Sequence, residues 1–118
     1  MTTSSDPRTP AAARRHDDNR LRLELRGELD HYTSPQLLGE AVAALAERGR
    51  AQTLSIDCHG LTFIDSVGLS ALLEIHRDAA RADVTAHLTN VGPQLERLLH
   101  LTGTYTHLTG AAEQESTS

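Results

Sequence analysis

The side chains best suited to chemistry in this chain are Asp65 and Ser66, which meet where an apolar segment ends and a helix is expected to begin. The first backbone N–H groups of a helix have no partner inside the helix, and the helix dipole adds about half a positive charge there. A phosphate on Ser66 would therefore meet unpaired donors. Serine is also a preferred N-cap residue, so these residues alone favour a structural cap at Ser66 over a regulatory serine.

Other candidate sites are weaker. The histidines are His16, His31, His59, His76, His87, His100 and His107. They show neither a paired i, i+4 spacing nor a Cys-His spacing, so we expect no metal ligands and no cofactor. His76 is expected at the edge of the core.

Catalysis and redox chemistry are also not expected. Asp57, Asp65 and Ser66 could be imagined as a hydrolase site, but no histidine is placed as a base, and neither a Gly-x-Ser-x-Gly elbow nor a Walker loop is present. We therefore predict no catalytic residue. Cys58 lies in a predicted strand and is interpreted as a small buried hydrophobe rather than a redox sensor.

Composition narrows the class of protein. The 118 residues suit one domain, with a net charge of −5 and no lysine among the 11 basic residues. Nucleic acid and anionic membranes both require a basic face, so neither is expected as the main partner. No apolar run approaches the roughly 18 residues of a membrane span, and no signal-peptide core is found. A cytoplasmic protein is predicted, which the single cysteine fits.

The first half of the chain predicts a tail, a strand and a helix. Residues 1–19 have no hydrophobic period and are predicted to be a flexible tail. Residues 21–26 alternate apolar and polar side chains, which indicates a half-buried strand that stops at Gly27. A helix follows, with Thr33 or Ser34 as cap, Pro35 in the first turn and Gln36 completing a capping box. Its inner face is predicted to be Leu37, Leu38, Ala41, Val42 and Leu45, with Gly49 as a left-handed stop.

The second half predicts alternating strands and helices. A strand over 53–58 is expected to end where His59 and Gly60 turn the chain, and a helix over 67–80 follows. That helix is predicted to present Leu69, Leu72, Leu73, His76 and Ala80 at helical spacing. A strand over 84–89 and a helix opening at Gly92 and closing at Gly103 come next, with Leu95, Leu98, Leu99 and Leu101 directed inward. Residues 105–108 are predicted to add a short strand.

This order predicts an α/β fold with a small mixed sheet and helices packed largely on one side. The folded domain is expected over residues 20–110, with a second flexible tail over 111–118.

Three runs of residues resemble the bacterial anti-sigma-factor antagonists, which are stand-alone STAS domains. They are residues 27–30 (GELD), 63–69 (FIDSVGL) and 97–103 (RLLHLTG). The match extends from about Leu21 to Leu108 in the family's order and spacing. The resemblance implies the same small sheet covered largely on one side.

The resemblance implies a phosphorylation switch rather than an enzyme. In this family the unmodified protein binds an anti-sigma factor, usually a serine kinase with an ATP-binding fold, and so frees a sigma factor for transcription. The kinase phosphorylates the serine that follows the motif aspartate, which is Ser66 here, and a metal-dependent phosphatase restores the unmodified form. The partner-binding residues carried over are Asp30, Asp65, Ser66, Val67 and Gly68. The alternative is a STAS module with a structural serine that serves as a scaffold subunit or a small-ligand or nucleotide binder.

Three positions depart from the family pattern. Val67 stands where a second hydroxyl residue is typical, so no neighbouring hydroxyl can replace Ser66. Ser70 stands where glycine is common. The family's first strand would fall on residues 11–16, where Arg14, Arg15 and His16 give a poor strand pattern, so that strand is expected to be short, disordered or displaced.

Overall fold

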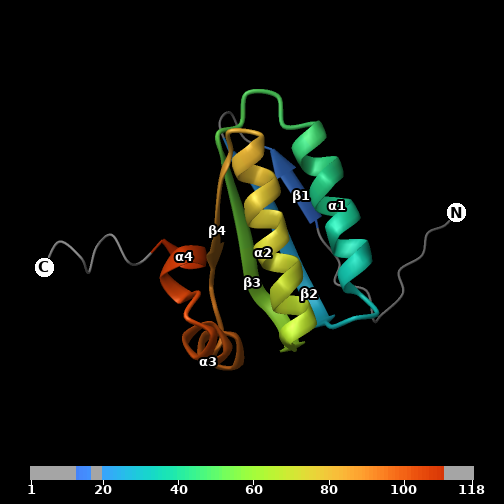
Figure 1. The fold of residues 1–118 in the computed structure, drawn as a ribbon. Helices are drawn as coiled ribbons and strands as arrows, with labels where there is room; N and C mark the ends of the chain where they lie inside the picture. The colour runs from blue at the N-terminus through green and yellow to red at the C-terminus, as the bar shows by residue number, and fades with distance from the viewer. Residues whose placement is uncertain (1–12, 17–19, 111–118) are drawn as a thin grey trace, which may run out of the picture.

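The computed structural model describes residues 13–16 and 20–110, which form one four-stranded sheet with helices (Figure 1). The elements are β1 (Ala13–His16), β2 (Arg20–Leu29), α1 (Ser34–Ala46), β3 (Thr53–Ile64), α2 (Ser66–Arg81), β4 (Thr85–Thr89), α3 (Pro93–Thr102) and α4 (Tyr105–Thr109). The strand order is β1-β2-β3-β4, with β1 antiparallel to β2 and the other pairs parallel. Helices α1 and α2 lie side by side on one face (Figure 1). The predicted α/β class with a mixed sheet is confirmed.

Part of the first predicted tail is a strand. β1 pairs with β2 so that Ala13 lies opposite Glu24 and His16 opposite Leu21. An edge strand needs only backbone hydrogen bonds to one neighbour, so the poor side-chain pattern does not prevent it from forming. The rest of that tail, residues 1–12 and 17–19, and the whole second tail, residues 111–118, lie outside the described residues.

Alternating leucines build the core of the sheet, as predicted. Leu21, Leu23 and Leu25 of β2 are buried, and Leu54 and Ile56 of β3 join them in one hydrophobic cluster. Full burial of such a side chain contributes about 1.5 to 3 kcal/mol. A slip of one residue would expose the whole set, so this face fixes the register of the parallel strands.

The two central strands run further than predicted. The strands were predicted to end at Gly27 and Cys58, whereas β2 continues to Leu29 and β3 to Ile64. Those two final residues lie opposite each other in the parallel ladder. The extension carries both strands to a common end, from which α1 and α2 then depart.

Gly27 and Gly60, which were interpreted as ending their strands, accommodate an irregularity in the ladder instead. The β2–β3 register shifts between Glu24 and Arg26 and again after Gly27, where φ is 80°. A Cβ on Gly60 would lie 2.6 Å from the carbonyl oxygen of Leu25, so glycine permits a close approach of the strands here. A bulge and a turn require the same residue types, which is why the prediction of a turn at His59 and Gly60 was wrong.

The start of α1 is held by a different bond from the one predicted. Thr33 is the N-cap residue, but its side chain makes no cap hydrogen bond, so the capping box with Gln36 does not form. The Thr33 hydroxyl donates to the carbonyl oxygen of Glu28 at 2.8 Å and accepts from the backbone N–H of Asp30 at 3.0 Å. Thr33 therefore ties the helix start to the end of β2.

The buried face of α1 is rotated slightly from the prediction. Leu37, Ala41 and Leu45 are buried as expected. Val42 is instead 55% exposed, and Ala44 takes its place in the core. Gly49 follows the helix with φ of 59°, in the predicted left-handed conformation.

A similar rotation applies to α2. Leu69 and Leu72 are buried as predicted, but Ile75 and Ala79, which were not among the predicted residues, also enter the core, and Ala80 is exposed. His76 is half-buried, as its assignment to the core edge required. Within the described part of the chain, no helix combines the length and the apolar character needed to span a membrane.

The last elements differ from the prediction at the C-terminal end. Leu95 and Leu99 of α3 are buried, but Leu101 is 77% exposed. Gly103 closes α3 in the left-handed conformation as predicted. The prediction of a short strand over 105–108 was wrong, because these residues form α4. Tyr105 and the buried Leu108 lie three residues apart, and only helical spacing turns both toward the core.

Candidate functional site

The candidate site lies where β2 and β3 end and where α1 and α2 begin (Figure 1). Leu29 pairs with Ile64 in the ladder, and the backbone N–H of Asp65 donates to the carbonyl oxygen of Leu29 at 3.3 Å. The loops after the two strands therefore emerge together at one edge of the sheet. We call this region the Ser66 edge and define it by residues 29–33 and 63–68.

Asp65, not Ser66, caps α2. Asp65 has extended backbone, and its Oδ1 accepts from the backbone N–H of Gly68 at 2.9 Å. Ser66 is the first helical residue, and its side chain is exposed. The preference for Ser66 as the cap was therefore wrong, because the cap position falls one residue earlier. The hydroxyl remains at the positive end of a 16-residue helix with no capping role.

Gly68 is a packing residue within this edge. It is buried, and a Cβ built on it would lie 2.4 Å from the carbonyl oxygen of Leu29. Glycine thus allows the first turn of α2 to press against the end of β2. Val67, one residue earlier, is 44% exposed. Of this predicted pair, only Val67 offers a side chain to a partner.

Asp30 is a turn residue at the same edge. Its Oδ1 accepts from the backbone N–H groups of Tyr32 at 2.9 Å and Thr33 at 3.2 Å. Burial raises the pKa of the Asp30 carboxyl, but the hydrogen bonds from Thr33 and Tyr32 outweigh it and leave the pKa below its ordinary value. Asp30 is therefore ionised at neutral pH. The structure places it beside the Asp65 segment, as the parallel strands predicted.

Two aromatic side chains of this edge were not among the predicted site residues. The chain has two tyrosines, one phenylalanine and no tryptophan. Tyr32 is 71% exposed in the turn before α1, and Phe63 is 40% exposed near the end of β3. With Val67 they form what we call the apolar rim of the site. An aromatic residue inside the polar turn over 30–34 was the available signal for Tyr32.

Comparison with known proteins is consistent with this geometry. A family described as "Mlab, STAS domain" matches residues 12–110. The chain belongs to the STAS domain family. The anti-sigma-B factor antagonist of Bacillus subtilis is 28% identical to this chain over 89 residues, which cover 75% of this chain and 79% of that protein.

Solved structures of anti-sigma factor antagonists have a similar fold. The crystal structure of an anti-sigma factor antagonist from Mycobacterium paratuberculosis matches with a TM-score of 0.75 and 26% identity, covering 89% of this chain and 87% of that one. The anti-sigma factor antagonist SpoIIAA in its unphosphorylated form matches with a TM-score of 0.64 and 22% identity, covering 79% and 83%. The resemblance to STAS-domain antagonists inferred from the three motifs is thereby confirmed.

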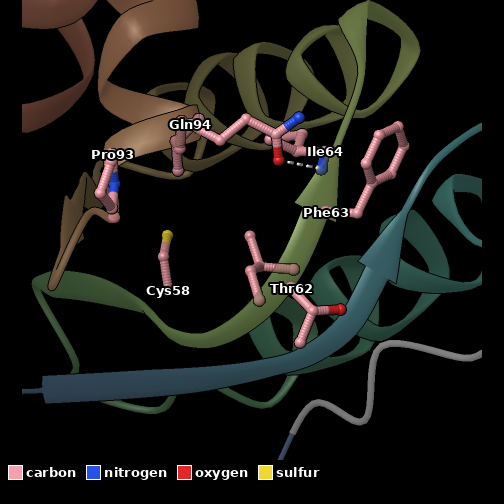
Figure 2. Close-up of a pocket in the computed structure, with 9 residues that line it drawn as sticks. Cys58, Thr62, Phe63, Ile64, Pro93 and Gln94 are labelled. Atoms are coloured by element: carbon pink, nitrogen blue, oxygen red, sulfur yellow. Dashed lines mark hydrogen bonds between the residues drawn. The ribbon is translucent and has the colours of Figure 1, made fainter.

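A small cavity of about 150 Å³ adjoins the Ser66 edge of the STAS domain, between β3 and the start of α3 (Figure 2). Gln94 closes it from the α3 side, where its Oε1 accepts from the backbone N–H of Ile64 at 3.2 Å. Cys58 lines the opposite wall, while the Phe63 ring lies on the far side of the strand (Figure 2). Burial and the charge of Asp57 raise the pKa of the Cys58 thiol to about 12, so the thiol is inert at neutral pH, as predicted for a buried hydrophobe.

Asp57, which was considered with Asp65 and Ser66 as a hydrolase site, bonds to other residues. Asp57 is buried, and it accepts from Arg22 Nη2 at 2.7 Å, Asn90 Nδ2 at 2.9 Å and the backbone N–H of His59 at 2.9 Å. These bonds hold the side chain on β3, seven residues before the strand ends. Among residues 13–16 and 20–110, no group of three or more histidine, cysteine or acidic side chains is arranged to hold a metal ion.

Proposed function

We propose that this STAS domain is an anti-sigma-factor antagonist that binds an anti-sigma serine kinase while Ser66 is unmodified and releases it when Ser66 is phosphorylated. The observation that carries the proposal is the exposed, non-capping hydroxyl of Ser66 at the start of α2, beside a separate cap at Asp65. The relatives support the same class, because they are anti-sigma factor antagonists.

A phosphate on Ser66 would act on the partner more than on the fold. It adds about −1.5 to −2 charge units at neutral pH and three acceptor oxygens. The helix start tolerates an anion, so the domain need not rearrange. A partner surface packed against the same turn would instead have to desolvate a dianion beside Asp65. Without cationic groups opposite, this costs several kcal/mol and weakens binding by a thousandfold or more.

The apolar rim supplies the contact area for that partner. Tyr32, Phe63 and Val67 are exposed on three segments of one edge, to which Asp30 and Asp65 also belong. Buried aromatic anchors surrounded by polar groups are typical of interface hot spots. We therefore infer a partner surface with an apolar patch bordered by basic residues.

The remaining parts of the proposal follow from the same site. A metal-dependent phosphatase would find the phosphate on an exposed first-turn residue, and no cofactor or catalytic residue of this chain is required. Neither nucleic acid nor membrane is proposed as a partner, given the net charge of −5. Both partners would meet the protein in the cytoplasm.

The decisive experiment mixes the purified protein with candidate anti-sigma kinases from the same genome, with and without ATP, and measures binding and intact mass. We expect a stable complex without ATP, and one added phosphate with loss of the complex when ATP is present. Binding that ATP leaves unchanged would favour the scaffold alternative. The cavity beside the Ser66 edge does not favour the small-ligand alternative at this edge, because its volume of about 150 Å³ is below the roughly 300 Å³ of ordinary ligand sites.

The apolar rim has its own test. Tyr32→Ala is expected to weaken kinase binding by about tenfold or more, since truncated hot-spot residues cost more than 1 kcal/mol. Leu101→Ala is the matched control, because Leu101 is 77% exposed on α3, outside the Ser66 edge. Calorimetry of both variants decides the matter. Equal affinities would remove Tyr32 from the interface.

A further inference from the structure

Away from the Ser66 edge, two imidazoles from different helices lie against each other. The ring centroids of His76 in α2 and His107 in α4 are 4.4 Å apart, with the ring planes inclined by 47°. His76 is half-buried, and His107 is exposed. The pair therefore forms a contact between a 16-residue helix and a five-residue helix.

Helix α4 packs mainly against β4 and α3, and its contact with α2 is small. A helix of five residues has no stability of its own, so it forms only because it is docked. Leu108 anchors it at 1% exposure, with its backbone N–H bonded to the carbonyl oxygen of Thr104 at 3.0 Å. Tyr105 stacks on His100 of α3 at a centroid distance of 4.2 Å. The histidine pair is the ring contact between α4 and α2.

On α2, His76 is flanked by Glu74, Arg77 and Asp78. Asp78 forms an ion pair with Arg81 at 3.2 Å, and on α3 Glu96 and His100 lie 3.8 Å apart. On β4, which packs against both α2 and α4, His87 is half-buried. Asp83 lines an open cavity beside His76, and the segment of β4 on that cavity, Thr85 and Ala86, is uncharged. Within residues 20–110, no acidic side chain forms an ion pair with His76 or His107.

We propose that the His76–His107 pair is an acid-sensitive latch, which supports the docking of α4 on β4 and α3 while at most one ring is protonated and weakens that docking when both are. Two positive charges at this separation repel, and within residues 20–110 no acidic side chain forms an ion pair with either ring. No residue of the Ser66 edge takes part, so the latch stands independently of the proposed function.

The direction of the pH effect follows from the surroundings of His76. Burial, and then the charge of His107, lower the pKa of His76 in the folded protein. The undocked form consequently binds more protons than the docked form. Docking of α4 is thus at full strength above about pH 6.5, the ordinary pKa of histidine, and weakens as the pH falls below that value.

Amide hydrogen exchange at pH 7.5 and pH 5.5, corrected for intrinsic rates, tests the latch. The informative amides are those of Leu108 and Gly110, both hydrogen-bonded within α4, with the Leu69 amide of α2 as an internal reference. We expect protection of the α4 amides to fall by about tenfold at the lower pH, consistent with a pair of like charges at contact distance. The reference amide is expected to stay unchanged.

Three variants separate the charge from the packing. His107→Phe keeps a ring and removes the titrating group, and His107→Gln removes both, so both are expected to show the same α4 protection at the two pH values. His100→Gln removes the other imidazole contact of α4 and is expected to keep the pH dependence. The proposal is overturned if the wild-type protein shows no pH dependence, if His107→Phe retains it, or if His100→Gln abolishes it.

Discussion

A side chain that caps a helix and one that accepts a phosphate need opposite surroundings, and the Ser66 edge provides both within two residues. Asp65 is fixed by its bond to the backbone of Gly68, whereas Ser66 presents an exposed hydroxyl. This division means that the two residues can be altered separately. It also changes the expected cost of removing the hydroxyl, because no cap is lost with it.

Substitutions at Ser66 are expected to affect binding and leave stability nearly unchanged. Ser66→Ala should bind the kinase as the wild type does, should accept no phosphate, and should change the free energy of unfolding by no more than about 0.5 kcal/mol. Ser66→Asp and Ser66→Glu should weaken binding, since added charge opposes docking. Affinity, intact mass and melting temperature are the measurements. A full phosphate on Ser66→Ala, at the exposed Ser70 or Thr62, would contradict a single acceptor.

Asp30 offers a test of charge against turn geometry. Asp30→Asn removes the charge and keeps an oxygen that can accept from Tyr32 and Thr33, whereas Asp30→Ala removes both. Charges at the border of an interface act mainly on association and are screened by salt. We expect the Asn variant to slow association, by less at high salt, and the Ala variant to lower the melting temperature as well. Surface plasmon resonance at two salt concentrations measures this. Unchanged association of the Asn variant would leave Asp30 as a turn residue only.

At the scale of the elements, glycines determine how the strands and helices meet, and they mark the limit of prediction from sequence. The leucine alternation of β2 located that strand correctly, because burial of one face follows a period of two. Gly27 and Gly60 were interpreted as stops, since a single sequence does not show which strand will lie against a missing Cβ. The Asp65-Ser66 junction was located from sequence, but Tyr32 and Phe63 were missed, because their exposure depends on neighbours that are distant along the chain.

The close contact at Gly68 predicts a measurable difference between two helical glycines. In Gly68→Ala the new Cβ would overlap the carbonyl oxygen of Leu29 at 2.4 Å, so α2 must shift at a cost of about 1 to 3 kcal/mol. Gly39→Ala, within α1, meets nothing within 4 Å and should stabilise the protein by about 0.5 to 1 kcal/mol. Urea unfolding of both variants is the measurement. A neutral Gly68→Ala would show that the helix start is not held tightly against β2.

At the scale of the whole molecule, one carboxylate links β2, β3 and the residue that follows β4. Asp57 of β3 bonds to Arg22 of β2 and to Asn90, which follows β4. Each partner comes from a distant part of the chain, so this arrangement could not be predicted from local sequence patterns. Burial raises the pKa of the Asp57 carboxyl, but the hydrogen bonds from Asn90, Arg22 and the His59 amide outweigh it and lower the pKa overall.

This lowered pKa predicts how the domain loses stability in acid. A carboxyl with a lower pKa in the folded state contributes stability that is complete above its unfolded value of about 3.9 and disappears as the pH falls through the folded value. Asp57→Asn should therefore cost about 1 to 3 kcal/mol at pH 7, where it breaks a charge-assisted bond to Arg22, and progressively less toward pH 3. Asp78→Asn is the control, since its ion pair with Arg81 is exposed and such pairs contribute little. Denaturant unfolding from pH 7 to pH 3 separates this effect from the histidine latch, which begins to act as the pH falls below about 6.5. If the free energy of unfolding of Asp57→Asn stayed below that of the wild type by the same amount over the whole pH range, the difference would arise from packing rather than from the charge.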